Sequence, residues 1–360
     1  MSLPPDVAIA HPQWVSLQTM PALMPVPSSA FLAGLTDDRF EGDRSALLGA
    51  VDHSLRFIRT PSAARRYPVA GITRERMERS LVRFRRLVEV SRTAADLQRA
   101  VAREFVAYQS IGLDGKGTVQ FTGYYEAVYP GSRVRTAEYR FPLYRLPPNF
   151  AQWRSPHPPR AMLEQSNLLS GLELVWLRDQ LQAFLIHIQG SARLQLTDGT
   201  VMTVGFGGKT DRTYTSIGRE LVKDGKMRLE EVTLPALIAY FERRPQELST
   251  YLMRNESFIF FRETNGSPAT GSIGVPVTAE RSIATDKSLM PPGGLALIRT
   301  QLPMGQEFRS ISRFVLDQDT GSAIRGAGRV DVFMGTGNEA KRRSGVMNHD
   351  GELYYLVLRQ

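Results

Sequence analysis

The chain has 360 residues, of which 42% are hydrophobic and 22% charged, a composition typical of a folded globular protein with two or three domains. It contains no cysteine, which excludes disulfides, a thiol nucleophile and thiolate-bound metal or iron–sulfur sites. The formal net charge of +9 favours an anionic partner such as nucleic acid, an acidic lipid surface or an acidic wall polymer. It is equally compatible with simple solubility.

Targeting and ligand signals are sparse. No run of about 18 apolar residues could span a membrane, and the first residues lack the basic and apolar regions of a secretory signal peptide. The chain is therefore expected to be either cytoplasmic or the mature form of an exported protein. The five histidines are scattered, with none at a ligand spacing such as HExxH, so we expect neither a metal ion nor a cofactor.

The first third of the chain predicts helices. Residues 1–35 are rich in proline, alanine and methionine and predict an extended lead-in. Apolar residues at near-helical spacing then predict a helix over 45–59. Thr73 and Thr93 stand where helix N-caps are expected, each ahead of an apolar stripe at helical spacing.

After Gly112 the pattern changes to short runs that are rich in β-forming residues. These runs are 118–125, 172–177, 183–189 and 192–196. The last two flank Gly190-Ser191 and predict a hairpin. Thr233 predicts the cap of a helical interlude over 234–244 and 245–255, and short strands resume at Phe258. Helices first and mostly strands afterwards predict an α+β protein, mainly β, with barrel-like domains.

Three aspartates interrupt apolar runs near the C-terminus. Asp317 and Asp319 are two residues apart, so on a strand their side chains share a face. Asp331 lies in a second apolar run, 330–334. Carboxylates among apolar residues are costly to bury unless they are paired or hydrogen-bonded. Spacing alone leaves open whether these aspartates are catalytic or are turn and strand-end residues.

The segment around these aspartates resembles the three-aspartate domain of cell-wall glycan lyases. Further motifs, in family order along about two-thirds of the chain, resemble the membrane-bound lytic murein transglycosylase A family. They are Phe121-Thr122-Gly123-Tyr124-Tyr125, Tyr144-Arg145-Leu146-Pro147-Pro148, Gln189-Gly190-Ser191, Tyr214-Thr215-Ser216-Ile217-Gly218, Asn255-Glu256-Ser257-Phe258, Asp286-Lys287-Ser288-Leu289 and Pro291-Pro292-Gly293.

The resemblance implies two domains with a groove between them for a glycan strand. Residues 1–125 plus 266–360 would form a double-psi β-barrel domain with N-terminal helices, and residues 126–265 an inserted, smaller β-rich domain. The implied reaction is cleavage of the MurNAc–GlcNAc β-1,4 bond of peptidoglycan with formation of 1,6-anhydromuramic acid. Because the C6 hydroxyl of muramic acid is the nucleophile, one carboxyl group suffices as acid and base, whereas most glycosidases need two.

The resemblance also implies the site. The family's catalytic aspartate lies in the pattern apolar–Asp–apolar–aromatic–x–Gly, which residues 330–335 match, so Asp331 is the predicted acid/base. Asp319 is predicted to tune it, with a structural role in the barrel turn as the alternative. Each predicted substrate-binding residue could instead be structural, Asp317 above all. These residues are Thr122, Gly123, Tyr124, Tyr125, Gln189, Ser216, Asp317 and Gly335.

Two other classes of function stay open. A hydrolytic glycosidase would use two carboxylates and would need Asp319 or Asp286 to act as the base. A non-catalytic peptidoglycan-binding or nucleic-acid-binding protein is compatible with the charge, although no interleaving of basic and aromatic residues favours nucleic acid. We therefore expect peptidoglycan glycan strands as the partner, no nucleic acid, and a monomer.

The family resemblance implies a periplasmic location and attachment to the outer membrane through a lipidated N-terminal cysteine. This sequence has no cysteine. Membrane contact is therefore expected only through an anchor that was removed with a leader, and otherwise the protein is expected to be soluble.

Overall fold

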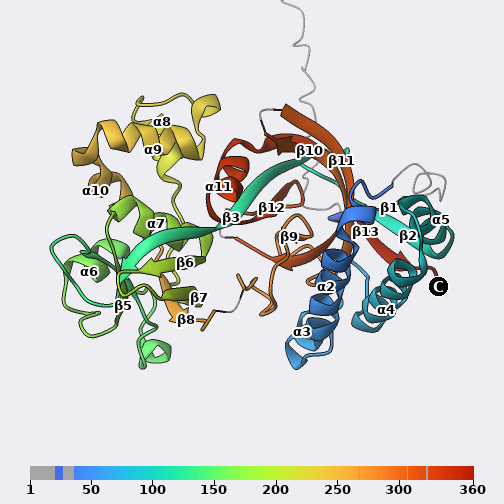
Figure 1. Cartoon of the computed structure of the whole chain (residues 1–360), viewed down its shortest axis with the longest axis horizontal. Helices are drawn as coiled ribbons and strands as arrows, with labels where there is room; N and C mark the ends of the chain where they lie inside the picture. Colours follow the sequence, from blue (N-terminus) through green and yellow to red (C-terminus); the bar gives the residue numbers. More distant parts are fainter. Residues whose placement is uncertain (1–20, 27–35, 267, 306, 322) are drawn as a thin grey trace, which may run out of the picture.

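The computed structural model describes residues 21–26, 36–266, 268–305, 307–321 and 323–360. The described chain folds into two lobes that share one long strand, β3 (Val119–Ser132) (Figure 1). The predicted α+β class is confirmed. Most of the predicted lead-in lies outside the described residues, apart from a segment that contains the short strand β1 (Leu23–Pro25). None of the described helices combines the length and the apolar character that crossing a bilayer requires.

Threonines begin most of the N-terminal helices. Thr73 accepts a hydrogen bond from the Arg76 backbone N–H at 3.2 Å, and Thr93 forms a capping box with Asp96. Such bonds satisfy backbone donors that a helix start leaves free. Both predicted caps are confirmed, while the first helix begins earlier than predicted. The helices are α2 (Phe40–Ile58), α3 (Pro61–Arg66), α4 (Arg74–Val90) and α5 (Ala94–Glu104).

The first lobe is a closed barrel. Within the described residues its strands pair in the order β13, β10, β11, β9, β12 and β3, and β3 returns to β13. The pairs β11–β9 and β12–β3 are parallel and the others antiparallel. The ring agrees with the barrel that the resemblance implied. Its elements are β9 (Ser282–Ala284), β10 (Leu295–Met304), β11 (Glu307–Asp319), β12 (Arg329–Thr336), α11 (Gly337–Val346) and β13 (Asn348–Leu358), with β2 (Phe105–Ser110) added beside β13.

The second lobe is built on the other half of β3. Residues 127–131 of β3 pair in parallel with β6, and β6, β7 and β8 continue the sheet. On the other side β3 pairs with β5 and β5 with β4. A bridge between Arg145 and Phe261 joins the two ends, so the sheet curls into a small barrel-like form. The strands are β4 (Phe141–Tyr144), β5 (Glu173–Leu177), β6 (Ser191–Leu196), β7 (Val201–Lys209) and β8 (Ile259–Glu263).

The hairpin predicted over 183–196 is wrong. The first half forms helix α7 (Gln180–Gln189), and the Asp179 side chain caps it by accepting from the Gln182 N–H at 2.8 Å. Gly190 ends this helix at φ +76°, a conformation that glycine adopts without strain. The apolar run fits a helix and a strand equally well, and the cap was the signal that decides between them.

The remaining helices of this lobe bear out the interlude that Thr233 predicts and add to it. Thr233 caps α9 by accepting from the Ala236 N–H at 3.3 Å, and α10 follows directly. The lobe is therefore more helical than the sequence pattern suggested. Its helices besides α7 are α6 (Arg160–Gln165), α8 (Ile217–Lys223), α9 (Leu234–Arg243) and α10 (Pro245–Met253), with 3-10 turns at Phe150–Gln152 and Leu229–Glu231.

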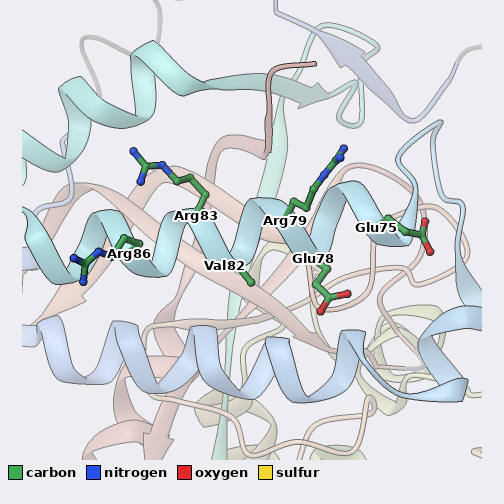
Figure 2. Close-up of a pocket in the computed structure, with 6 residues that line it drawn as sticks. All are labelled: Glu75, Glu78, Arg79, Val82, Arg83 and Arg86. Carbon is green, nitrogen blue, oxygen red and sulfur yellow. The ribbon is translucent and has the colours of Figure 1, made fainter.

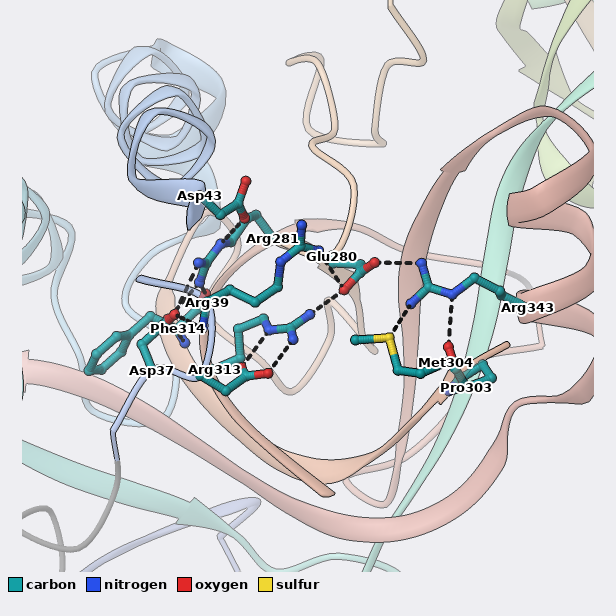
Figure 3. Close-up of polar contacts among 11 residues, drawn as sticks. Asp37, Arg39, Asp43, Glu280, Arg281, Pro303, Met304, Arg313, Phe314 and Arg343 are labelled. Carbon is teal, nitrogen blue, oxygen red and sulfur yellow. Dashed lines mark hydrogen bonds and ion pairs between the residues drawn. The ribbon is translucent and has the colours of Figure 1, made fainter. Parts of the chain in front are cut away.

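Buried arginines tie the segment before α2 to the barrel (Figure 3). Arg281 has no exposed side-chain surface and pairs with Asp37 at 2.6 Å and with Asp43 at 2.9 Å. Arg313, equally buried, pairs with Asp38 at 2.6 Å. Buried charges need such partners because their loss of hydration is otherwise uncompensated. The N-terminal segment is thereby fixed to β11.

Glu280 extends this network toward β12. Its buried carboxylate pairs with Arg39 at 2.9 Å, with Arg343 of α11 at 2.6 Å, and with Arg313. Its backbone N–H donates to the Phe333 carbonyl of β12 at 2.6 Å. The network therefore ends on β12, the strand that carries Asp331.

Candidate active site

The three aspartates lie on strands that flank β9. Ala284 of β9 pairs with Asp319 of β11 on one side and with Asp331 of β12 on the other. These two aspartates therefore stand level, two inter-strand spacings or roughly 10 Å apart between their backbones. Asp317 lies earlier on β11, beside Ile283. The barrel thus brings together aspartates that lie in two separate apolar runs of the sequence.

Asp331 is partly exposed, with 19% of its side chain accessible. Thr122, its register partner on β3, donates a hydrogen bond to Asp331 Oδ1. Arg329 Nε lies 3.6 Å from the same oxygen, and Arg329 Nη2 donates to Thr122 Oγ1 at 3.3 Å. Within the described residues no hydrogen bond or ion pair engages Asp331 Oδ2. The second oxygen is therefore available to a ligand.

Asp319 ends β11 and fastens the adjoining turn. Its Oδ1 accepts the backbone N–H groups of Ser272 and Thr320, both at 2.8 Å. Burial raises the pKa of Asp319, and this effect outweighs the backbone donors, the Tyr124 phenol and the Lys287 charge. Asp319 therefore keeps its proton to a higher pH than a free aspartate does.

Asp317 is fully enclosed. Its Oδ2 accepts hydrogen bonds from Thr285 and Tyr355, both at 2.7 Å, and its Oδ1 is paired with Lys287. Burial raises the pKa of Asp317 and lowers the pKa of Lys287, although each charge partly stabilises the other. With no exposed surface on its side chain, Asp317 holds the barrel interior together in this structure.

The residues of the motif Phe121–Tyr125 on β3 contact different lobes. Gly123 lets α11 approach, since a Cβ there would lie 2.8 Å from Ser344 Cα. The Tyr124 ring packs on Phe333 at 5.1 Å. Burial and then the negative charges of Asp319 and its neighbours raise the pKa of the Tyr124 phenol. Its hydroxyl is buried beside Asp319.

Tyr125 points away from Tyr124, as alternation along a strand requires. It is buried, and its hydroxyl lies 3.2 Å from that of Tyr129. The Gln189 side chain, at the end of α7, accepts the Tyr125 backbone N–H at 3.3 Å. Tyr125 and Gln189 therefore join β3 to the second lobe.

Ser216 and Gly335 lie at ends of elements. Ser216 caps α8, accepting from the Arg219 N–H at 3.4 Å. Gly335 has φ +102°, and a Cβ there would lie 3.3 Å from the Ala279 Cβ. Glycine therefore suits this position at the end of β12 on conformation and on space. No hydrogen bond between described atoms joins either residue to Asp331.

Sequence reasoning gave no role to Arg329 or Lys287. Arg329 precedes Asp331 by two residues, and the same alternation that grouped Asp317 with Asp319 could have found it. Lys287 lies in the family motif Asp286–Leu289, but nothing local links it to Asp317, 30 residues away. Only the pairing of β9 with β11 brings these two side chains together.

Asp286, considered as a second catalytic carboxylate, is engaged by its own loop. It accepts from the Ser288 N–H and hydroxyl at 3.0 and 2.6 Å and from the Gly326 N–H at 2.9 Å. Burial alone would raise the pKa of Asp286, but these hydrogen bonds and the Arg325 charge outweigh it and lower the pKa. Protein donors thus engage both oxygens of Asp286, and a carboxylate with a lowered pKa is a weak base, so Asp286 is poorly suited to the base role that a hydrolase would need.

A hollow on the N-terminal helices lies apart from these residues (Figure 2). Its charges are largely paired, since Glu78 lies 2.8 Å from Arg59 and Arg83 lies 2.5 Å from Glu104. We assign it no ligand. No group of three or more acidic or histidine side chains in the described chain is arranged to hold a metal ion. The hollow is lined by Glu75, Glu78, Arg79, Val82, Arg83 and Arg86.

Comparison with known proteins agrees with this architecture. Residues 120–262 match the MltA specific insert domain and residues 281–357 match the 3D domain. Membrane-bound lytic murein transglycosylase A of Escherichia coli strain K12 is 31% identical over 257 residues, which cover 69% of this chain and 68% of that protein.

Two crystal structures share the fold. Escherichia coli MltA with bound chitohexaose has a TM-score of 0.74 at 26% identity, covering 95% of this chain and 96% of that one. A membrane-bound lytic murein transglycosylase from Agrobacterium tumefaciens has a TM-score of 0.76 at 24% identity, covering 94% and 98%. The barrel and the insert together place the chain in a two-lobed class of wall-glycan lyases. The chain belongs to the membrane-bound lytic murein transglycosylase A family, as its motifs predicted.

Proposed function

We propose that this protein cleaves the β-1,4 bond between MurNAc and GlcNAc in peptidoglycan and releases a 1,6-anhydromuramic acid product. The placement of Asp331 carries the proposal. This aspartate is partly exposed on a barrel strand, Thr122 holds its Oδ1, and its Oδ2 is open. Family membership supplies the substrate class, because the curated relatives are lytic murein transglycosylases and the Escherichia coli relative has been crystallised with chitohexaose.

In the proposed reaction Asp331 moves one proton in both directions. The proton on Oδ2 passes to the glycosidic oxygen as the bond from that oxygen to C1 of the muramic residue breaks. The departing GlcNAc keeps this proton as its C4 hydroxyl. The C6 hydroxyl of the same muramic residue then bonds to C1, and its proton returns to Asp331 Oδ2. No water is consumed and Asp331 ends in its starting state.

The other predicted residues tune Asp331, orient it, contact the sugar or support the site. Asp319, whose raised pKa favours a bound proton, tunes Asp331 from across β9. Thr122 orients Asp331, and Tyr124 and Ser216 contact sugar. The remaining predicted residues contact the protein itself and hold the elements around the site in place. These are Gly123, Tyr125, Gln189, Asp317 and Gly335.

We also propose the division into a barrel domain, 1–125 plus 266–360, and an insert, 126–265. The change of partners along β3 supports it, because Glu126 pairs with β12 while Ala127 pairs with β6. The glycan strand would lie between the two lobes, bound to a monomer in the periplasm, with attachment to the outer membrane as in relatives named membrane-bound. Nucleic acid is not a partner in this proposal.

Asp331→Asn tests the proposal, because it removes the titratable oxygen while keeping the shape of the side chain. We expect release of 1,6-anhydromuropeptides from sacculi, followed by mass spectrometry, to fall by about 10²-fold to 10⁴-fold with unchanged circular dichroism. Asp319→Asn should retain part of the activity. Full turnover by Asp331→Asn together with a dead Asp319→Asn would move the acid role to Asp319.

The competing functions give different products. Incorporation of ¹⁸O from labelled water, with reducing-end products alone, would establish a two-carboxylate hydrolase instead. Binding of the wild-type protein to sacculi without release of any soluble fragment would establish a non-catalytic binding protein.

A further inference from the structure

Arg329 and Thr122 stand in one hydrogen-bonded chain with Asp331. We propose that Arg329, directly and through Thr122, keeps the exchangeable proton of Asp331 on Oδ2 and stabilises the carboxylate that forms when this proton leaves. Arg329 is thus a positioning residue that acts through Asp331. The inference rests on the proposed role of Asp331 as acid and base, and it goes beyond that role by naming the device that prepares the carboxyl group.

The direction of the hydrogen bonds supports the first part of the proposal, which is that the proton of Asp331 is held on Oδ2. A guanidinium can only donate, so Arg329 Nη2 donates to Thr122 Oγ1, at 3.3 Å. The arrangement that leaves no hydroxyl hydrogen unpaired has Thr122 donating to Asp331 Oδ1. Arg329 Nε, 3.6 Å from the same Oδ1, further disfavours a proton there. The proton of neutral Asp331 therefore resides on Oδ2, the oxygen that the protein leaves open.

The unpaired Nε of Arg329 supports the second part of the proposal, which is stabilisation of the carboxylate. Arg329 Nε is buried and has no hydrogen-bond partner among the described residues, and its 3.6 Å separation from Asp331 Oδ1 is too long for a hydrogen bond. When Asp331 gives up its proton, Oδ1 gains negative charge and a small rotation closes this gap. The donor is then unsatisfied before the reaction and satisfied in the transition state, which is the condition for lowering a barrier.

In the described structure the ion pair that reaches Asp331 comes from Arg329. On β3 the polar neighbours are Thr122 and the neutral Tyr124 phenol, and beyond the phenol lies Asp319 of β11. On β9 the neighbour is Ala284. On α11, which follows β12, Arg343 is paired with Glu280 and Arg342 with Glu339. From the second lobe, Tyr214 lies within electrostatic reach of Arg329.

Arg329→Met is the first test, with kcat and KM measured separately on soluble glycan strands. We expect kcat to fall by about 10²-fold, as for loss of one pre-organised donor, with little change in KM. The alkaline limb of the pH profile should move to higher pH, because the carboxylate loses its cation and the acid form persists longer. Arg329→Lys keeps the charge and should restore the position of that limb.

Arg342→Met is the matched control, since it removes the same charge from an exposed arginine on α11 whose partner is Glu339. It should leave kcat and the pH profile unchanged. Thr122→Val and Thr122→Ser test the relay, because valine removes the hydroxyl and serine keeps it. We expect the valine variant to lose kcat and the serine variant to retain most of it, with thermal unfolding confirming that every variant folds.

The outcomes separate this inference from the proposed function. A raised KM with unchanged kcat in Arg329→Met would show that Arg329 binds substrate and would overturn the inference. Wild-type kcat in Thr122→Val would overturn the relay. If Asp331→Asn is inactive while Arg329→Met has wild-type kcat and pH profile, only this inference fails. If Asp331→Asn is active, the proposed acid role of Asp331 fails, and this inference fails with it.

Discussion

Asp317, Asp319 and Asp331 share one chemistry and have three different surroundings. Asp317 is enclosed by Lys287, Thr285 and Tyr355. Asp319 is fastened by backbone N–H groups and has a raised pKa. Asp331 keeps an open oxygen and a partly exposed side chain. Because charge, burial and hydrogen bonding together set the proton affinity of a carboxyl group, these surroundings suit one structural residue, one modulator and one proton carrier.

The pair formed by Lys287 and Asp317 gives the first prediction at the scale of single residues. Lys287→Met leaves a buried carboxylate without its cation, and we expect the free energy of unfolding to fall by about 3–5 kcal/mol. Chemical denaturation followed by circular dichroism measures this change. The double variant Lys287→Met with Asp317→Asn should recover part of the loss, because no unpaired charge remains. A loss below about 1 kcal/mol in the single variant would place this pair among weak surface pairs.

Strand β3 links the two lobes, and its close contact with α11 depends on one glycine. The first half of β3 pairs with β12 and β13 and the second half with β5 and β6 (Figure 1). At Gly123 the chain passes so close to α11 that a Cβ would meet Ser344 Cα at 2.8 Å and Met334 Cγ at 3.1 Å. Since one of these neighbours is backbone, it cannot move aside alone.

We therefore expect Gly123→Ala to lower the free energy of unfolding by about 1–3 kcal/mol through overpacking. It should also lower activity, because β3 carries Thr122 beside Asp331. Thermal and urea unfolding measure the first effect, and product release from sacculi the second. Gly49→Ala in α2 is the matched control, because a Cβ at Gly49 meets nothing within 4 Å. This control should raise stability by about 0.4–1 kcal/mol, and equal effects of both substitutions would refute the packing argument.

At the scale of the whole molecule, the charges around Glu280 join segments that are far apart in sequence (Figure 3). Arg39 precedes α2, Arg313 lies on β11 and Arg343 lies on α11, and all three pair with Glu280. Burial alone would raise the pKa of Glu280. The hydrogen bond from Arg343 and the charges of the arginines outweigh burial and lower the pKa from 4.5 to about 2. That difference corresponds to about 3 kcal/mol of stability.

Glu280→Gln should remove most of this stabilisation, about 3 kcal/mol near neutral pH. The sign follows from the lowered pKa: the contribution is fully present above the unfolded value of 4.5 and is lost as the pH falls through about 2. The difference in unfolding free energy between wild type and variant should therefore shrink between about pH 5 and pH 2. Denaturation series at several pH values measure it.

Glu352→Gln is the control for this measurement, because Glu352 pairs at 3.0 Å with Arg299 and both side chains are more than one-third exposed. An exposed pair of this kind contributes about 0–1 kcal/mol. A pH-independent difference for Glu280→Gln would show that packing, and not the paired charge, is responsible.

The sequence by itself determined the family, the α+β class and the caps at Thr73, Thr93 and Thr233. These features are local, since a cap needs only the residues of one turn and a family motif is a short string of neighbours. It misassigned α7, because a short apolar run has no period that separates helix from strand. Packing against the other helices of that lobe, through Phe184 and Leu185 among others, buries its apolar side chains in the folded protein.

Only the tertiary structure decided which side chains contact each aspartate. The sequence grouped Asp317 with Asp319, yet strand register places Thr122 against Asp331, and the pairing of β9 with β11 brings Lys287, which follows β9, to Asp317. A pairing between strands depends on register and on contacts across the whole chain, which no local pattern specifies. The motifs therefore named the aspartates, and the closed barrel gave each of them its surroundings and its proposed role.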